Sequence, residues 1–149
     1  MRITFDTNLL VYAADSAAGE RHSAAASLLR RAFQVDALLV LQSLAEFVDA
    51  VTRKRKLEWE VALRFVDAWR AALPVVGADP DTFNAATRAA RLHGIPFWDA
   101  MLWAVADAAE CDVLLSEDFQ DGRRLGRVQF VNPFDPANRR LVDTILPPA

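Results

Sequence analysis

The chain has 149 residues, of which 53% are hydrophobic and 25% charged, and its formal net charge at pH 7 is −3. This composition is typical of one soluble globular domain and excludes a disordered or fibrous chain. The negative charge argues against a protein that coats nucleic acid through bulk positive charge, and the single cysteine excludes an internal disulfide and a thiolate metal site.

The first predicted element is a strand over residues 2–6, which ends in an acid, Asp6. Thr7 and Asn8 then open a helical pattern. An acid so close to the first residue leaves no room for the apolar core of a signal peptide. No apolar run approaches the roughly 18 to 20 residues that cross a bilayer. We therefore expect a cytoplasmic protein with no membrane role.

Alternating strands and helices follow along the chain. Short apolar runs predict four further strands, at residues 37–41, 74–77, 112–116 and 128–131. Apolar positions at three- and four-residue spacing predict helices at residues 20–33, 43–56, 58–72, 79–93 and 97–110. The continuous apolar runs are typical of strands that are covered on both faces. The pattern favours one doubly wound α/β domain over residues 1–149, with a mainly parallel, five-stranded sheet.

The C-terminal segment, residues 132–149, has a different character. It contains four prolines and shows only weak hydrophobic periodicity. Proline lacks a backbone N–H and fixes one backbone angle, so it interrupts regular structure. We expect this segment to be an extended tail on the surface of the domain.

Four acids fall at or beside the edge of the sheet where the parallel strands end. Ligand sites of open parallel sheets lie outside this carboxyl edge. Asp6 ends the first strand and Asp118 follows the fourth. Glu46 lies in the first turn after the second strand, and Asp99 begins the helix that leads back into the fourth. The fold therefore predicts that the four carboxylates converge.

Each of these acids also has an ordinary structural explanation. Ser43 and Glu46 have the spacing of a capping box. Asp6 could cap a helix, Asp118 could form a turn, and Asp99 could complement a helix dipole. Capping does not require that all four converge on one edge of one sheet, however. Their joint position favours a shared site.

Such convergence points to a metal ion. Two carboxylates about 4 Å apart repel by about 4 kcal/mol at an effective dielectric of about 20, so protons or cations must compensate the cluster. Hard oxygen ligands without cysteine or histidine suit Mg²⁺ or Mn²⁺ better than zinc. Two divalent ions would neutralise four carboxylates. In such a site one ion activates water and the other stabilises the leaving oxygen.

The chain resembles the PIN-domain ribonucleases, and specifically the VapC-type toxins of bacterial toxin-antitoxin pairs. The resemblance covers nearly the whole chain and is carried by DTN at residues 6–8, QSLAEF at 42–47, FWDAM at 97–101 and LLSEDF at 114–119. It implies a three-layer α/β/α fold and cleavage of single-stranded or looped RNA with Mg²⁺ or Mn²⁺, leaving a 5′-phosphate. It also implies a homodimer and a small antitoxin protein that occludes the site.

The resemblance also implies roles for individual residues. Asn8 and Ser116 would be polar supports that orient the acids. Glu117 and Asp121 lie so close to Asp118 that either could take or share its place. By position, four acids would be the catalytic, metal-holding residues: Asp6, Glu46, Asp99 and Asp118.

Other residues near the acids invite a role in binding RNA. Trp98 and Trp103 flank Asp99 and could stack on bases, but packing in the core or in a dimer is the more common use of tryptophan. An arginine clump follows the fourth acid and could contact a phosphate backbone or simply be a solvated loop; it comprises Arg123, Arg124 and Arg127.

Two further functions compete with a nuclease. A PIN fold could be kept as a non-catalytic interaction module, although the four intact acids argue against this. A Mg²⁺-binding phospho-receiver domain would place an aspartate at the end of its third strand and a lysine after a later one. Here Gly77 ends the third run and no lysine follows Lys56. The sequence favours the nuclease over both.

Overall fold

A computed structural model describes residues 1–149, and each of the five predicted strands forms in it. The strands are β1 (Ile3–Phe5), β2 (Leu39–Val40), β3 (Val75–Val76), β4 (Val113–Leu115), β5 (Arg124–Leu125) and β6 (Val128–Val131). The α-helices are α1 (Thr7–Ala14), α2 (Glu20–Ala32), α3 (Leu41–Arg53), α4 (Trp59–Ala72), α5 (Pro80–His93), α6 (Phe97–Ala108) and α7 (Arg139–Ile145). None of these helices is long and apolar enough to cross a membrane.

The sheet is mainly parallel, as predicted, but it does not have five strands. One sheet has the order β1-β4-β6-β5 and a second pairs β2 with β3. A parallel bridge from Ile3 to Ala37 is the link between the two sheets. The extra strand, β5, pairs antiparallel with β6 through a tight turn at Gly126, whose φ is +57°. A two-residue strand formed by a hairpin has too short an apolar pattern to be recognised in the sequence.

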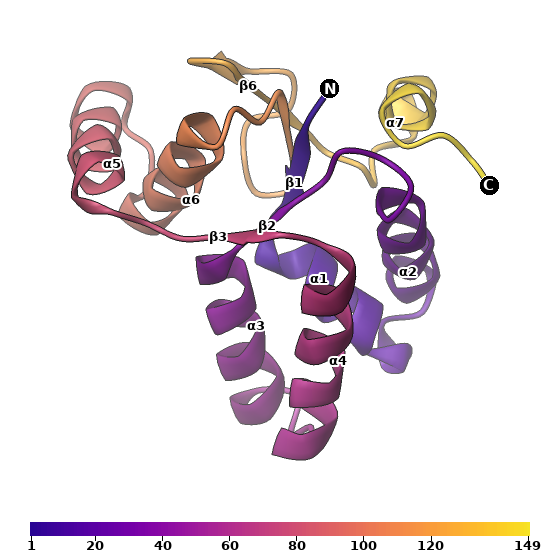
Figure 1. The fold of residues 1–149 in the computed structure, drawn as a ribbon. Helices are drawn as coiled ribbons and strands as arrows, with labels where there is room; N and C mark the ends of the chain where they lie inside the picture. Colours follow the sequence, from indigo (N-terminus) through magenta and orange to yellow (C-terminus); the bar gives the residue numbers. More distant parts are fainter.

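Helices cover both faces of the strands, which gives the three-layer α/β/α arrangement (Figure 1). Val113 and Leu115 of β4 belong to the core formed with α1, α2, α3, α4 and α7, whereas Leu114 between them belongs to the core formed with α5 and α6. Successive side chains of a strand point to opposite faces. Burial on both faces therefore explains the continuous apolar run of β4.

The expectation of an extended tail at residues 132–149 was wrong. The turn η2 (Pro136–Asn138) leads into α7, which packs on the core through Val142, Ile145 and Leu146. An ion pair of 2.7 Å joins Asp143 of α7 to Arg31 of α2. The prolines flank the helix instead of interrupting it, since Pro136 begins η2 and Pro147 follows the last buried residue. Seven helical residues are too few for a clear periodic signal.

Candidate active site

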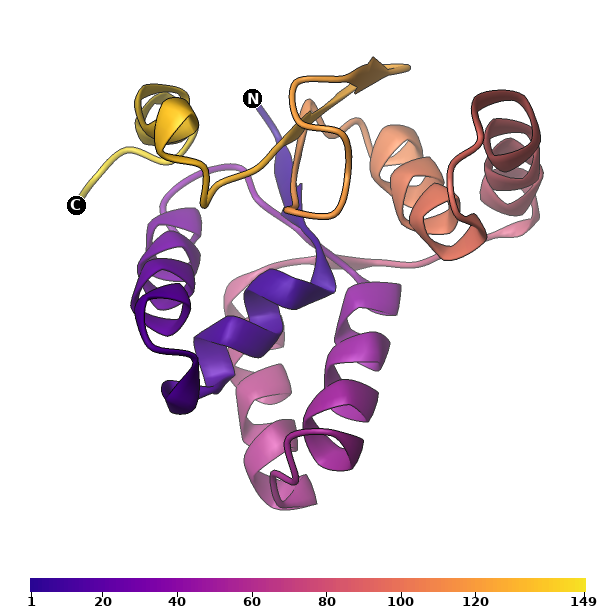
Figure 2. The same cartoon turned by 180° about the vertical axis from the view of Figure 1, so that it is seen from behind.

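The four predicted acids are carried by segments that meet at the carboxyl edge of the sheet. β1 and β4 are parallel and in register, and the Asp6 backbone N–H donates to the Leu115 carbonyl across them (2.9 Å). Helix α1 leaves this edge and passes between α2 and α3 (Figure 2). The same edge therefore holds the end of β1, the loop after β4 and the first turns of α1 and α3.

Asp6 is the buried member of the group, with 6% of its surface exposed. It caps α1, and its carboxylate accepts hydrogen bonds from the Thr7 backbone N–H (2.6 Å) and the Ser116 hydroxyl (2.6 Å). Burial is the main reason that the pKa of Asp6 is raised to about 6, and repulsion from Asp118 and Asp99 raises it as well. The two hydrogen bonds favour the charged form and lower the pKa in part. The site therefore holds a carboxylate that is poorly compensated.

Glu46 is oriented from two sides. Its carboxylate accepts from the Thr7 hydroxyl (2.9 Å) and from the Gln42 amide (2.8 Å), and that amide also donates to the Trp98 carbonyl (2.9 Å). The predicted capping box of Ser43 and Glu46 was wrong. Helix α3 begins two residues earlier than the prediction and has no side-chain cap, and the Ser43 hydroxyl donates to the Phe5 carbonyl instead. Glu46 is thus free of the capping role.

Asp99 and Asp118 complete the cluster. Asp99 lies in the first turn of α6; burial raises its pKa, and repulsion from Asp118 and Glu46 raises it further. Burial also raises the pKa of Asp118, as does repulsion from Glu117, whereas the hydrogen bond from the Asn8 amide lowers it. Burial is the main cause of these raised pKa values, and repulsion among Asp6, Asp99 and Asp118 adds to it, which indicates that the three carboxylates lie near one another.

The two alternatives to Asp118 have other partners. Glu117 accepts from the Tyr12 hydroxyl and forms an ion pair with Arg21 (3.4 Å). Asp121 accepts from the Asn132 backbone N–H (2.8 Å) and from the side-chain amide of Asn138, which ties the start of the C-terminal segment to the loop after β4. Asp118, in contrast, interacts with the other acids. The geometry therefore favours Asp118 as the fourth member.

Two arginines of the clump after Asp118, Arg124 and Arg127, have partners in and beside the β5–β6 hairpin. Arg127 pairs with Glu110 (3.6 Å) and Asp112 (3.5 Å), just before β4 begins, at the opposite edge of the sheet. The Arg124 guanidinium donates to the Arg127 carbonyl within the same hairpin. For these two arginines, the structure favours a role in the hairpin over a contact with a phosphate at the acidic site.

The two tryptophans that flank Asp99 differ in environment. Trp103 is buried, and its indole N–H donates to the Leu125 carbonyl (2.9 Å), so it packs in the core. Trp98 is 63% exposed and lines a hollow of about 440 Å³ together with Gln42 and Glu46. Only Trp98 could be reached by a ligand that enters the site.

Three polar residues of the site were not predicted from the sequence. Thr7 follows Asp6 directly, and Gln42 precedes Glu46 by one helical turn, so their positions could have marked them as supports. Arg21 has no such local signal. It reaches Glu117 only because α2 packs beside α1 in the folded chain.

The chemistry of this site matches a hard divalent cation, because its ligands would be carboxylate oxygens. The side chains do not stand in a finished coordination shell, however: no group of three or more His, Cys, Asp or Glu residues is arranged so that it could hold a metal ion. Both oxygens of Asp6 and both of Glu46 accept hydrogen bonds from the protein. Binding would require these side chains to exchange hydrogen bonds within the protein for bonds to the ion.

A family model described as "PIN domain" matches residues 3–128. The solved structure of Mycobacterium tuberculosis VapC20, a Sarcin-Ricin loop cleaving toxin, is 18% identical with a TM-score of 0.65, over 78% of this chain and 89% of that one. A toxin-antitoxin complex from Klebsiella pneumoniae is 19% identical with a TM-score of 0.65, over 89% of this chain and 98% of that one.

A third structure, VapBC2 from Rickettsia felis bound to a fragment of promoter DNA, is 17% identical with a TM-score of 0.63, over 89% of this chain and 98% of that one. No curated protein sequence matches this chain. At these levels of identity the solved structures establish the fold, and the chemistry has to be argued from the site.

Proposed function

The chain belongs to the PIN domain family, and from this premise we propose that it is a Mg²⁺- or Mn²⁺-dependent endoribonuclease that acts as the toxin of a toxin-antitoxin pair. The observation that carries the proposal is the convergence of Asp6, Asp99 and Asp118 from three separate segments, with a raised pKa for each. Perturbed carboxylates that lie near one another are a pattern expected of a metal-assisted hydrolase. The family match decides against the receiver-type alternative.

The acids would hold the cation and the surrounding residues would orient the acids. When bound, a divalent ion supplies Lewis acidity for the attacking water and neutralises charge on the phosphate. The ligands would be Asp6, Glu46, Asp99 and Asp118. Hydrogen bonds from Thr7, Ser116, Gln42 and Asn8 orient three of them, Asp6, Glu46 and Asp118. In the proposed reaction a water oxygen bonds to phosphorus and the bond to the 3′ oxygen breaks, leaving a 5′-phosphate and a 3′ hydroxyl.

The proposed partners follow from the same premise. Two of the similar structures are a toxin-antitoxin complex and a VapBC2 complex. We infer that this chain likewise binds a small antitoxin protein that occludes the acidic site, and that it forms a homodimer. Growth should stop when the chain is expressed alone, and co-expression of the small protein encoded by the neighbouring reading frame should restore it.

The direct test is RNA cleavage by the purified protein. We expect single-stranded RNA to be cut with Mg²⁺ or Mn²⁺ and to stay intact with a chelator. Asp6→Asn and Asp99→Asn should lose cleavage while keeping a wild-type circular dichroism spectrum. Asp67→Asn, which neutralises an exposed carboxylate on α4, is the matched control and should cleave as the wild type does. Cleavage that survives chelation would contradict the carboxylate-metal mechanism.

The same variants separate a nuclease from an interaction module. A non-catalytic PIN fold would bind its partner equally well with or without the four acids, and it would show no RNA cleavage under any metal condition. If the wild type and Asp99→Asn arrest growth to the same extent, the toxicity does not come from the proposed reaction.

A further inference from the structure

Arg21 is a cation beside the loop that carries the fourth acid. Its guanidinium forms an ion pair with Glu117 (3.4 Å), the residue before Asp118. An RNA phosphate that approaches a cluster of carboxylates is repelled unless positive charge lies nearby. A cation at this position could therefore reduce the repulsion between the acids and an approaching phosphate backbone.

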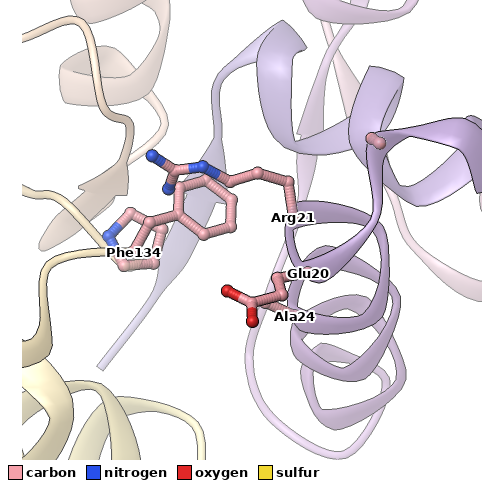
Figure 3. Close-up of a pocket in the computed structure, with 6 residues that line it drawn as sticks. Glu20, Arg21, Ala24 and Phe134 are labelled. Carbon is pink, nitrogen blue, oxygen red and sulfur yellow. The ribbon is translucent and has the colours of Figure 1, made fainter.

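The Arg21 side chain is held in place by aromatic rings. Its guanidinium lies 4.4 Å from the centre of the Phe134 ring and 6.0 Å from that of Tyr12. The two rings pack edge to face, with centroids 5.6 Å apart. Figure 3 shows Arg21 extending from α2 along the Phe134 ring. The N–H donors of a guanidinium lie in its own plane. When that plane stacks on an aromatic face, the donors point outward from its edge and stay available to a ligand.

Most donors of this guanidinium remain available. A guanidinium carries five N–H donors, and the contact with Glu117 is longer than an ordinary hydrogen bond. The Arg21 side chain is 45% exposed. The Tyr12 hydroxyl also donates to Glu117, so this carboxylate keeps a partner when Arg21 turns toward another anion. If Arg21 left Glu117 to bind a phosphate, the Glu117 carboxylate would still accept the hydrogen bond from Tyr12.

Arg21 also borders an open cavity that a nucleotide could enter. The cavity has a volume of about 600 Å³, and Glu20 is the one acid on its wall. In Figure 3 the Glu20 carboxylate and the Arg21 guanidinium lie apart, in separate parts of the cavity. Its lining residues come from the start of α2 and from the segment after β6: Ala18, Glu20, Arg21, Ala24, Pro133 and Phe134.

Two other arginines, Arg127 and Arg31, are engaged elsewhere. Arg127 pairs with Glu110 and Asp112 at the opposite edge of the sheet. Arg31, further along α2, pairs with Asp143 at 2.7 Å and is 14% exposed. Neither combines exposure, unused donors and a position next to the acid-bearing loop.

We propose that Arg21 binds a backbone phosphate of the RNA strand that occupies the acidic site, with Phe134 holding the guanidinium in position. The proposal rests on the proposed ribonuclease function and adds a substrate-binding residue to it. A phosphate contact positions the strand without reading its sequence. The contact should therefore be visible with RNA of any sequence.

The test is the salt dependence of RNA binding. A fluorescein-labelled, single-stranded oligoribonucleotide of mixed sequence is titrated with Asp99→Asn protein in a chelator, at several NaCl concentrations, and anisotropy is recorded. Adding Arg21→Ala should weaken binding about tenfold at low salt. It should also reduce the slope of log K against log salt by about 0.7, as expected for one lost phosphate contact on a single strand.

Two further variants serve as controls. Arg21→Lys keeps the charge but not the fork or the ring stacking, so it should retain the slope with intermediate affinity. Arg88→Ala removes an exposed arginine from α5, on the other side of the sheet, and should leave affinity and slope as in the parent.

The outcomes separate this proposal from the reaction itself. An unchanged slope in Arg21→Ala, with or without a lower melting temperature, would mean that Arg21 has only a structural role and would overturn the proposal. No binding by the parent at low salt, or an equal loss in Arg88→Ala, would overturn it as well. If Arg21→Ala changes the slope but the wild type cleaves no RNA with Mg²⁺ or Mn²⁺, the phosphate contact stands and the ribonuclease function fails.

Discussion

The Ser116 hydroxyl donates a 2.6 Å hydrogen bond to the buried carboxylate of Asp6, and so joins the loop after β4 to the end of β1. The same oxygen accepts from the Asp118 backbone N–H (3.0 Å). One hydroxyl therefore orients a buried acid and the backbone of a second acid at the same time.

Replacing this hydroxyl should impair activity more than stability. Ser116→Ala removes a hydrogen bond that favours the charged form of Asp6, so the pKa of Asp6 should rise above its present value of about 6. We expect RNA cleavage to fall by about 10- to 100-fold, the range found when supports of metal ligands are lost. The acidic limb of the pH–rate profile should move to higher pH. A proportional loss at every pH would contradict the assigned role.

Neutralising Asp6 should stabilise the metal-free fold at neutral pH. The pKa of Asp6 is raised from 3.8 to about 6, so the folded state binds a proton more tightly than the unfolded state. The stability of the wild type therefore falls as the pH rises through this interval, by up to about 3 kcal/mol. Asp6→Asn has no charge at this position, so its stability should not fall in this interval. Its amide cannot accept both hydrogen bonds of the carboxylate, which offsets part of the gain.

The measurement is thermal unfolding in a chelator. At pH 8 we expect Asp6→Asn to melt several degrees above the wild type, since about 1 kcal/mol corresponds to about 2–4 °C in a domain of this size. At pH 4, near the lower end of the interval between the two pKa values, most of the loss of stability in the wild type is absent, so the difference should shrink or reverse. A destabilised Asp6→Asn at pH 8 would show that the hydrogen bonds of Asp6 outweigh its desolvation.

Divalent cations should raise the melting temperature of the wild type. An ion that binds only the folded state at about 100 times its Kd adds about 2.7 kcal/mol. We expect Mg²⁺ and Mn²⁺ to stabilise the wild type and the Asp67→Asn control, and to have little effect on Asp99→Asn. The effect should be larger above pH 6 than below it, because the proton on Asp6 competes with the cation. Equal stabilisation of all three proteins would indicate that the ions bind elsewhere.

The C-terminal helix should contribute to stability although its sequence suggested a tail. Leu146 is fully buried, so Leu146→Ala should cost about 2–5 kcal/mol in urea unfolding. Leu141 belongs to the same segment but is 39% exposed, and Leu141→Ala should change stability by less than about 0.5 kcal/mol. Equal effects of the two substitutions would mean that α7 is not docked in solution.

The parts of the fold that were predicted correctly have strong local patterns. The continuous apolar run Val113–Leu115 is buried on both faces, and the acids that follow such runs could be assigned to the carboxyl edge because parallel strands end together. Helix α7 and strand β5 are too short for a periodic signal. Their positions depend on contacts with distant segments, such as the one between Arg31 and Asp143.

The candidate site was predictable to a lesser degree. Spacing alone could not separate Asp118 from Glu117 and Asp121, because a loop places neighbouring side chains in different directions. In the structure Glu117 faces Tyr12 and Arg21, while Asp121 faces Asn138. These partners come from α1, α2 and the C-terminal segment, and only tertiary packing brings them together.

Helix α1 gives the site an all-or-none character. Along its length Thr7 contacts Glu46, Asn8 contacts Asp118, and Tyr12 contacts Glu117, while its N-terminus is capped by Asp6. An α-helix turns by about 100° per residue, so a slip of one residue would break these contacts together. Three of the four acids, Asp6, Glu46 and Asp118, are thus aligned by one helix, and a ligand that rotated α1 would displace all three in a single step.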